Sequence, residues 1–192
     1  MKKEVLIEQF KANNGWLHSK DFDYQNQVYE KLYEMIENHE VEKVQDGLFK
    51  YLPSHNFSLQ EELAQIYPKG VFCLFSAWQH YGLSTTASFQ QHMAFPHKSN
   101  LEKIAYPPVQ LYYWSEGQYL LGINEVDHIK IYDIEKSVCD AVKFRNKVGE
   151  EIMYEVLKNY MNLKTRNLEK LMSYAQMMRL EKIMTPILKS LL

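Results

Sequence analysis

The sequence predicts an α+β protein built from two parts, because the spacing of its apolar residues changes along the chain. Residues 2–38 place apolar side chains at the three-to-four-residue period of helices, and residues 41–52 surround an Asp46-Gly47 turn. After further helical segments, residues 90–132 carry the aromatic and β-branched residues that strands favour, and residues 134–191 return to a helical period. We therefore expect helices and a hairpin, then strands, and finally a helical bundle.

Composition excludes several protein classes. The 192 residues are 46% hydrophobic and 24% charged, with a net charge of -2 when His is neutral, so a disordered, collagen-like or disulfide-scaffold chain is excluded. Cys73 and Cys139 lie among apolar residues, and we expect two buried free thiols in a reducing cytoplasm. Glu4 and Glu8 interrupt any signal peptide, and no apolar run approaches the ~20 residues of a membrane span. We expect a soluble cytoplasmic protein with no membrane partner.

Two helices are expected first. One begins near Lys2 and ends at Asn13-Asn14-Gly15, since glycine favours the left-handed backbone that stops a helix. A short helix follows over residues 20–22, with Ser19 as its N-cap.

A longer third helix and a hairpin complete this part. The helix covers residues 24–38, with Asp23 as N-cap, and the hairpin covers residues 41–52 because Asp46-Gly47 suits a tight turn. The apolar stripe of the third helix consists of Val28, Leu32, Met35 and Ile36. Three helices and a hairpin in this order predict a winged helix-turn-helix domain over residues 1–52.

A second domain, mixed α/β, is expected over residues 57–192, after a polar linker at 53–56. Ser58 and Glu61 form a capping box for a helix through Ile66. An apolar helix is expected over 71–81, strands over 90–95, 109–114, 118–123 and 128–132, and helices over 134–145, 150–161, 168–178 and 180–191, with breaks at 146–149 and 164–167.

Five segments, in order and at the right spacing, resemble the AbiEi family, the antitoxin and transcriptional-regulator component of abortive-infection systems. The resemblance covers nearly the whole chain. The segments are PKGVFCLFSAWQHYGLSTT (68–86), HMAFPHKSN (92–100), YPPVQLYYWS (106–115), IKIYDIEKSVCDAVKFRNKVGEEIMYEVLKNYM (129–161) and YAQMMRLEKIMTPILKSLL (174–192).

The resemblance implies a function in two parts. The N-terminal winged helix would bind operator DNA with inverted repeats and repress its own operon. The C-terminal domain would act as an antitoxin against a nucleotidyltransferase-type toxin in phage defence, without a tight complex. The alternative is a protein-interaction module whose winged helix no longer binds DNA.

Most candidate DNA contacts follow from the expected placement of the third helix in the major groove, with the hairpin on the backbone or in the minor groove. Asn and Gln can bond adenine, Tyr can bond phosphate, and Lys and Arg neutralise phosphate charge. On the outward face of the third helix the candidates are Gln25, Asn26 and Tyr29. Beside this helix and on the hairpin they are Lys20, Lys31, Lys43 and Lys50, and a separate basic cluster at one helix end consists of Lys143, Arg145 and Lys147.

Charge opposes part of this assignment. Residues 1–56 carry seven Lys, no Arg and ten acidic residues, and Glu30, Glu34 and Glu37 lie on the helix expected in the groove. Residues 134–192 carry 11 basic and seven acidic residues, so we expect them to supply much of the attraction to phosphate. The competing interpretation is that these basic residues are only solvated, or that they interact favourably with the dipole at the C-terminal end of a helix.

No active site and no cofactor are expected. A phosphate-binding glycine loop and a nucleophile elbow are both absent from the sequence. A strand or loop could bring His92 and His97 together as metal ligands, although scattered polar histidines are commoner, and we expect no metal site. A minor alternative is general acid–base catalysis by Asp127, His128 and Asp133. Another is an enzyme site assembled from residues dispersed along the sequence.

Overall fold

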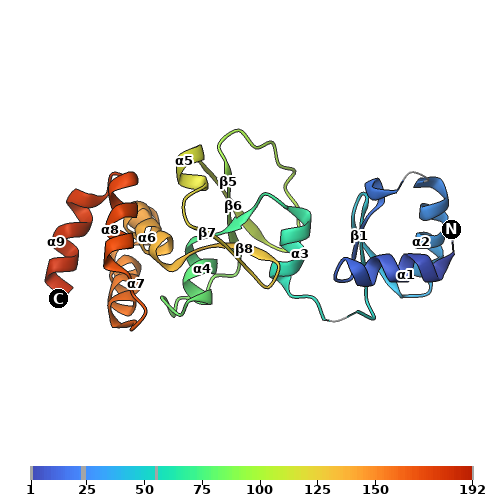
Figure 1. The fold of residues 1–192 in the computed structure, drawn as a ribbon, viewed down its shortest axis with the longest axis horizontal. Coiled ribbons are helices and arrows are strands. Elements are labelled where there is room, and N and C mark those ends of the chain that lie inside the picture. Colours follow the sequence, from blue (N-terminus) through green and yellow to red (C-terminus); the bar gives the residue numbers. More distant parts are fainter. Residues whose placement is uncertain (1, 23–24, 55, 192) are drawn as a thin grey trace. The chain divides into compact units, whose positions relative to one another are not determined.

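Two compact units make up the chain, Met1–Pro68 (unit 1) and Lys69–Leu192 (unit 2) (Figure 1). The computed structural model describes residues 2–22, 25–54 and 56–191, and over those ranges it contains nine α-helices and two sheets. The expected mixed α+β class is therefore confirmed. Within the same ranges, no helix combines the length and the apolarity needed to cross a membrane.

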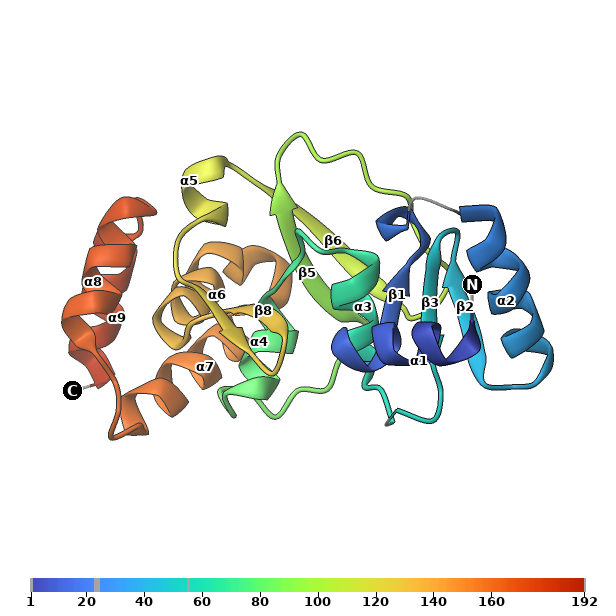
Figure 2. The same ribbon diagram turned by 45° about the vertical axis from the view of Figure 1, so that its right-hand side comes forward.

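Unit 1 is a three-stranded antiparallel sheet with helices packed against it. The strands lie side by side in the order β1-β3-β2 (Figure 2). Its apolar core includes Phe10 of the first helix, Leu32 of the second and Phe49 of β3. The elements are α1 (Lys3–Ala12), β1 (Trp16–His18), a 3-10 turn (Ser19–Asp21), α2 (Gln25–Glu37), β2 (Val41–Gln45), β3 (Leu48–Tyr51) and α3 (Leu59–Ile66).

The segment between α1 and α2 differs from the prediction. Trp16–His18 is a strand paired with β3, and the expected helix at 20–22 is a single 3-10 turn over Ser19–Asp21. Ser19 is the first residue of that turn and does not cap it. The reason is tertiary, because the Trp16 and Leu17 side chains are buried only when this segment is extended along β3. The predicted cap Asp23 lies outside the described residues.

The capping box at the start of α3 is confirmed. The Ser58 hydroxyl accepts from the Glu61 amide, and the Glu61 carboxylate accepts from the Ser58 amide. Contacts within unit 1 hold this helix, because the Phe57 ring meets Trp16 edge to face and Lys50 pairs with Glu62. The compact unit accordingly ends at Pro68, whereas the predicted linker at residues 53–56 precedes α3.

Unit 2 has a five-stranded mixed sheet in the order β6-β5-β4-β8-β7. The pairs β5–β6 and β4–β8 are parallel, and the pairs β4–β5 and β7–β8 are antiparallel. Figure 1 shows α6 to α9 gathered on one side of this sheet. The elements are β4 (Val71–Phe72), α4 (Leu74–His80), β5 (Gln91–Pro96), β6 (Val109–Trp114), α5 (Glu116–Tyr119), β7 (Ile123–Val126), β8 (Ile129–Tyr132), α6 (Ile134–Val148), α7 (Glu150–Asn162), α8 (Leu168–Met177) and α9 (Glu181–Leu191).

Three predictions in unit 2 are wrong. Val71–Phe72 forms a central strand, so the helix expected over 71–81 begins only at Leu74. The strand expected over 118–123 is the helical turn α5 followed by β7. The break expected over 146–149 is confined to Gly149, whose φ of +98° ends α6 after Val148.

A buried ion pair lies at the start of α6. The Lys136 ammonium donates to both carboxylate oxygens of Asp140, at 2.7 and 2.8 Å, and the two side chains are 0% and 1% exposed. The ammonium also lies over the rings of Trp114 and Tyr132. These rings and the carboxylate together replace the water that this cation loses.

The turn after α8 contains Arg179 in a left-handed conformation, with φ of +59°. The Leu180 amide donates to the Ala175 carbonyl and the Arg179 amide donates to the Gln176 carbonyl. This is the Schellman arrangement, in which the position of Arg179 is usually occupied by Gly. A side chain at this position therefore strains the backbone.

Arg179→Gly is expected to stabilise unit 2 by about 0.5 kcal/mol, because released strain exceeds the added freedom of the unfolded chain. Thermal unfolding measures the change. Gly149→Ala is the control: an added Cβ meets no atom within 4 Å, but the φ of +98° is unfavourable for Ala, so the midpoint should fall. A lower midpoint for Arg179→Gly would contradict the expectation.

Candidate nucleic-acid interface

One face of α2 is polar and exposed. Val28, Leu32 and Met35 face the core, so Asn26 and Glu30 on the other side lie in solvent. Asn26, one of the predicted DNA contacts, is thus exposed. The Gln25 side chain lies outside the described residues. The other exposed residues of this face are Gln27, Tyr33, Glu34 and Glu37.

Tyr29 is half-buried, although it was expected on the outward face. Its hydroxyl shares a 2.9 Å hydrogen bond with the Ser19 hydroxyl, and its ring meets Phe49 edge to face and stacks on Tyr33. Tyr29 therefore joins α2 to the 3-10 turn and to β3. The phenol is already engaged within unit 1.

Most of the predicted cations near α2 and the hairpin have carboxylate partners. Lys31 pairs with Glu34 on the same helix, and Lys43 pairs with Asp46 of the hairpin turn at 2.7 Å. Lys50 lies between Glu42 at 3.1 Å and Glu62 at 2.9 Å. By contrast, Lys20 is exposed in the 3-10 turn.

The hydrogen bonds in these pairs raise the pKa of two lysines. Burial alone would lower the pKa of Lys50, but the hydrogen bonds that its ammonium donates to Glu62 and Glu42 raise it. The hydrogen bond that Lys43 donates to the Asp46 carboxylate raises the pKa of Lys43. Both cations are neutralised within unit 1, so a DNA phosphate would have to compete with carboxylates for them.

A second group of predicted cations lies on α6 of unit 2. Arg145 donates to the Val142 carbonyl of its own helix at 2.9 Å, so its guanidinium is already engaged within α6. Lys147 is exposed, with its ammonium 5.7 Å from the centre of the Phe144 ring. Lys143 is half-buried, and burial lowers its pKa. No carboxylate pairs with any of these three among the described residues.

Sequence reasoning missed a hydrogen-bonded chain formed by Ser88, His92 and Tyr112. The Ser88 hydroxyl lies 2.9 Å from His92 Nε2, and the Tyr112 hydroxyl lies 3.0 Å from His92 Nδ1. Residues 92 and 112 lie on adjacent parallel strands, so only the sheet register brings them together. The pattern is that of a nucleophile, a base and an orienting group.

Two features weaken that chemistry. Burial lowers the pKa of His92 to about 4, which makes its imidazole a poor base near neutral pH. The Ser88 hydroxyl donates its proton to the Gln90 carbonyl at 2.9 Å. Ser88 is therefore not activated as a nucleophile in this arrangement.

The buried His92 is expected to make folding stability depend on pH. Unfolded His takes up a proton near pH 6.5, whereas folded His92 does so only near pH 4. Its contribution is complete above about pH 6.5 and is lost as the pH falls towards 4. Urea midpoints between pH 7 and 5 should fall less steeply for His92→Gln than for the wild type. His97→Gln, at an exposed site, is the matched control; an unchanged slope for His92→Gln contradicts the expectation.

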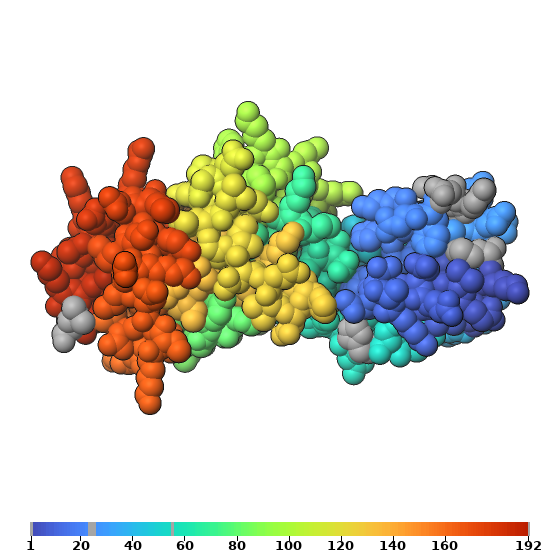
Figure 3. Space-filling view, in the orientation of Figure 1, coloured from blue at the N-terminus to red at the C-terminus, as the bar shows by residue number. Residues whose placement is uncertain are grey.

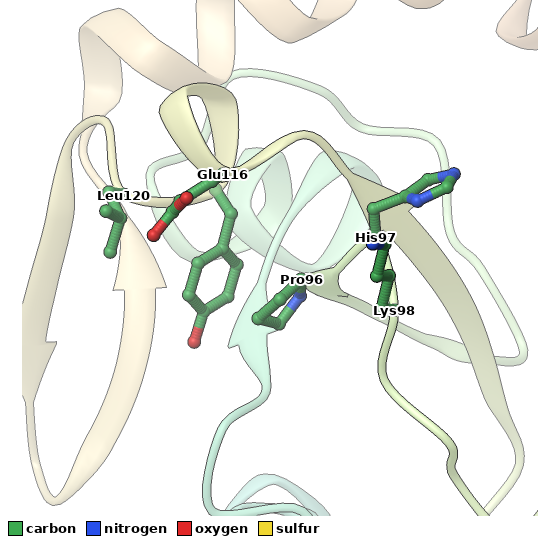
Figure 4. A pocket seen from close by; sticks show the side chains of 6 residues that line it. Pro96, His97, Lys98, Glu116 and Leu120 are labelled. Atoms are coloured by element: carbon green, nitrogen blue, oxygen red, sulfur yellow. The ribbon is translucent and has the colours of Figure 1, made fainter.

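His97 lies in a different setting from His92. It lines a hollow of about 440 Å³ together with Pro96, Lys98 and Glu116, and Figure 4 shows its ring pointing away from Glu116. Tyr119, from the same hollow, donates to the Lys69 carbonyl at 2.6 Å. In Figure 3 the light green segment that follows β5 projects from unit 2. Among the described residues, no cluster of three or more His, Cys, Asp or Glu could hold a metal ion.

The three residues that were candidates for acid–base chemistry do not share one environment. Asp127 and His128 form the exposed turn between β7 and β8, both at positive φ. Asp133 is buried, caps α6 through the Lys136 amide and accepts from Tyr174 and Lys170. These contacts explain Asp133 as a structural residue.

Both cysteines are buried free thiols, as expected. Burial raises the pKa of the Cys73 and Cys139 thiols, so neither forms a reactive thiolate near neutral pH.

Comparison with models of known protein families finds no match to this chain, and comparison with curated protein sequences finds none either.

Proposed function

We propose that the protein is a DNA-binding transcriptional regulator that also acts as an antitoxin, with a winged helix-turn-helix in unit 1. The observation that supports this proposal most is the order of elements: helix, strand, helical turn, helix and hairpin. In such a domain the helix before the hairpin enters the major groove. Here that helix is α2, which exposes Asn26, Gln27 and Glu30.

Sequence readout and affinity would come from different residues. Asn and Gln side chains on α2 suit adenine, and Glu30 suits the amino group of cytosine. These contacts add little attraction to phosphate, and Lys31, Lys43 and Lys50 are paired with carboxylates. We therefore assign much of the phosphate attraction to Lys143, Arg145 and Lys147 of unit 2, with Lys20 contributing from unit 1.

The antitoxin part of the proposal rests on the resemblance of unit 2 to the AbiEi family. The partner would be a nucleotidyltransferase-type toxin, countered without a tight complex. A fragment lacking unit 1, Met1–Pro68, would lose operator binding and keep the ability to rescue cells from that toxin. A folded fragment that fails to rescue would contradict this division of roles.

Fluorescence anisotropy tests the DNA-binding part directly. The full-length chain is titrated onto labelled duplex DNA from upstream of its own gene, and onto a scrambled duplex, at two salt concentrations. We expect tighter binding to the native duplex and a fall in affinity with salt. Asn26→Ala should lessen the preference for the native duplex, while Asn162→Ala, at an exposed site on α7, should not. Equal, weak binding to both duplexes would reject the repressor function.

A second candidate function is a protein-interaction module. The observation favouring it is that three cations beside α2 are neutralised by carboxylates, which leaves an acidic exposed face at Glu30 and Glu37. Such a face suits a basic protein surface better than a duplex. Absence of DNA binding, together with toxin rescue that requires unit 1, would select this function.

A further inference from the structure

A second hollow in unit 2 has two cations in its lining and no carboxylate. It has a volume of about 580 Å³, within the size range of small-molecule sites. The cations are Lys143 of α6 and Arg179 of the turn between α8 and α9. The remaining lining residues are Ser115, Gly117, Gln118, Leu121, Met177 and Met178.

Lys143 is a half-buried cation without a carboxylate partner among the described residues. Asp140 is the nearby acid, but both of its oxygens accept from Lys136. Lys136 and Asp140 cancel each other, so the charge facing the hollow is that of Lys143 and Arg179. Burial lowers the pKa of Lys143, the charge of Asp140 offsets only part of this effect, and a bound anion would offset more of it.

Arg179 keeps a long cationic side chain where the backbone favours glycine. Its φ is +59°, at the position of the Schellman turn that glycine usually occupies. Arg179 lines the hollow, and its guanidinium offers several donors to an anion. An arginine therefore stands at a position where the left-handed backbone favours glycine.

The third feature of the hollow is an apolar wall. Met177 is 67% exposed, although it is one of the largest apolar side chains in its helix, and Met178 beside it is buried. Leu121 adds a half-buried apolar surface. Methionine sulfur and methyl groups contact the faces and edges of aromatic rings favourably, so this wall suits a flat ring.

We propose that this hollow is a binding site for a mononucleotide, with the phosphate between Lys143 and Arg179 and the base against Met177 and Met178. Two cations and no carboxylate in the lining favour a phosphate, and the apolar wall favours a ligand that carries a ring. Gln118 and Ser115 supply further hydrogen-bonding groups at the same site. The site would give the protein a small-molecule ligand in addition to the duplex, with Lys143 shared between the two.

Isothermal titration calorimetry of the full-length chain tests the proposal with three probes: inorganic phosphate, ribose 5-phosphate and AMP. We expect all three to bind, with AMP tightest because only AMP has a base. Lys143→Gln and Arg179→Gly should each weaken AMP binding about tenfold, the size expected for one charge-assisted hydrogen bond. Met177→Ala should weaken AMP binding and leave ribose 5-phosphate unaffected.

The variants separate loss of the site from loss of the fold. Arg179→Gly is expected to raise the thermal midpoint, so weaker binding by this variant cannot come from unfolding. Lys158→Gln removes one exposed charge from α7 and should bind AMP as the wild type does. The proposal is overturned if the wild type binds no probe at millimolar concentration, or if both cation variants bind like the wild type. It is also overturned if these variants weaken duplex DNA binding alone, because the cations would then belong to a DNA surface.

Discussion

Asp140→Ala is expected to lower the free energy of unfolding of unit 2 by about 3–5 kcal/mol, the usual loss when one member of a buried ion pair is removed. The Lys136 ammonium, 0% exposed, would keep its contacts with the Trp114 and Tyr132 rings but lose both carboxylate oxygens. Ring faces alone do not replace a carboxylate as a partner for a fully buried cation.

Urea unfolding followed by tryptophan fluorescence measures this loss, and amide hydrogen exchange in β8 and α6 assigns it to unit 2. The double variant Lys136→Met/Asp140→Leu should recover most of the stability, because two apolar side chains can replace a buried pair. Asp46→Ala is the contrasting control: its pair with Lys43 is exposed, so the midpoint should barely move. A loss below about 1 kcal/mol for Asp140→Ala would show that water reaches Lys136.

Replacing Lys143, Arg145 and Lys147 together with Ala is expected to weaken operator binding about 100-fold at low salt. Each phosphate contact contributes about 0.9 to the slope of log affinity against log salt, so the slope should fall by about 2.7 if all three residues touch phosphate. This expectation rests on the proposed DNA-binding function. It assigns the attraction to unit 2, because the lysines around α2 are mostly paired with acids.

Anisotropy titrations at four salt concentrations measure both quantities. The matched control is Lys158→Ala/Lys182→Ala/Lys189→Ala, which removes the same charge from exposed positions on α7 and α9. If only the α6 variant loses affinity, the location of these three cations, rather than the total charge of the protein, determines DNA binding. Equal losses for the two triple variants would mean that net charge, rather than a defined contact surface, attracts the duplex.

Elements with strong local signals were predicted well from sequence. The capping box at Ser58, the Asp46-Gly47 turn and the periodic helices from residue 134 onward all depend on neighbours within about four residues. The wrong predictions concern segments whose secondary structure depends on pairing with strands that are distant in sequence. Val71 and Phe72 follow a helical pattern into α4, yet they form a strand because β5 and β8 lie on either side. Trp16–His18 is a strand for the same reason, through β3.

The sequence identified which residue types could contact DNA, but it did not predict the surroundings of each side chain. Sequence identified Lys31, Lys43 and Lys50 as cations near the expected groove helix, but not their carboxylate partners, because Glu42 and Glu62 reach Lys50 only in the folded unit. The hollow around Lys143 and Arg179 was not predictable, since 36 positions separate the two residues in sequence. The Ser88, His92 and Tyr112 chain was missed for the same reason.

By itself, the amino-acid sequence determined the α+β class, most of the helices and hairpins, and the uneven distribution of charge between the two ends of the chain. These properties depend on local periodicity, turn residues and composition, which act over a few positions. Tertiary structure alone decided which lysines are neutralised, which histidine is buried and which cations share a hollow. Such properties depend on burial and on distances between residues far apart in sequence, and those are set only when the sheets pair and the helices pack.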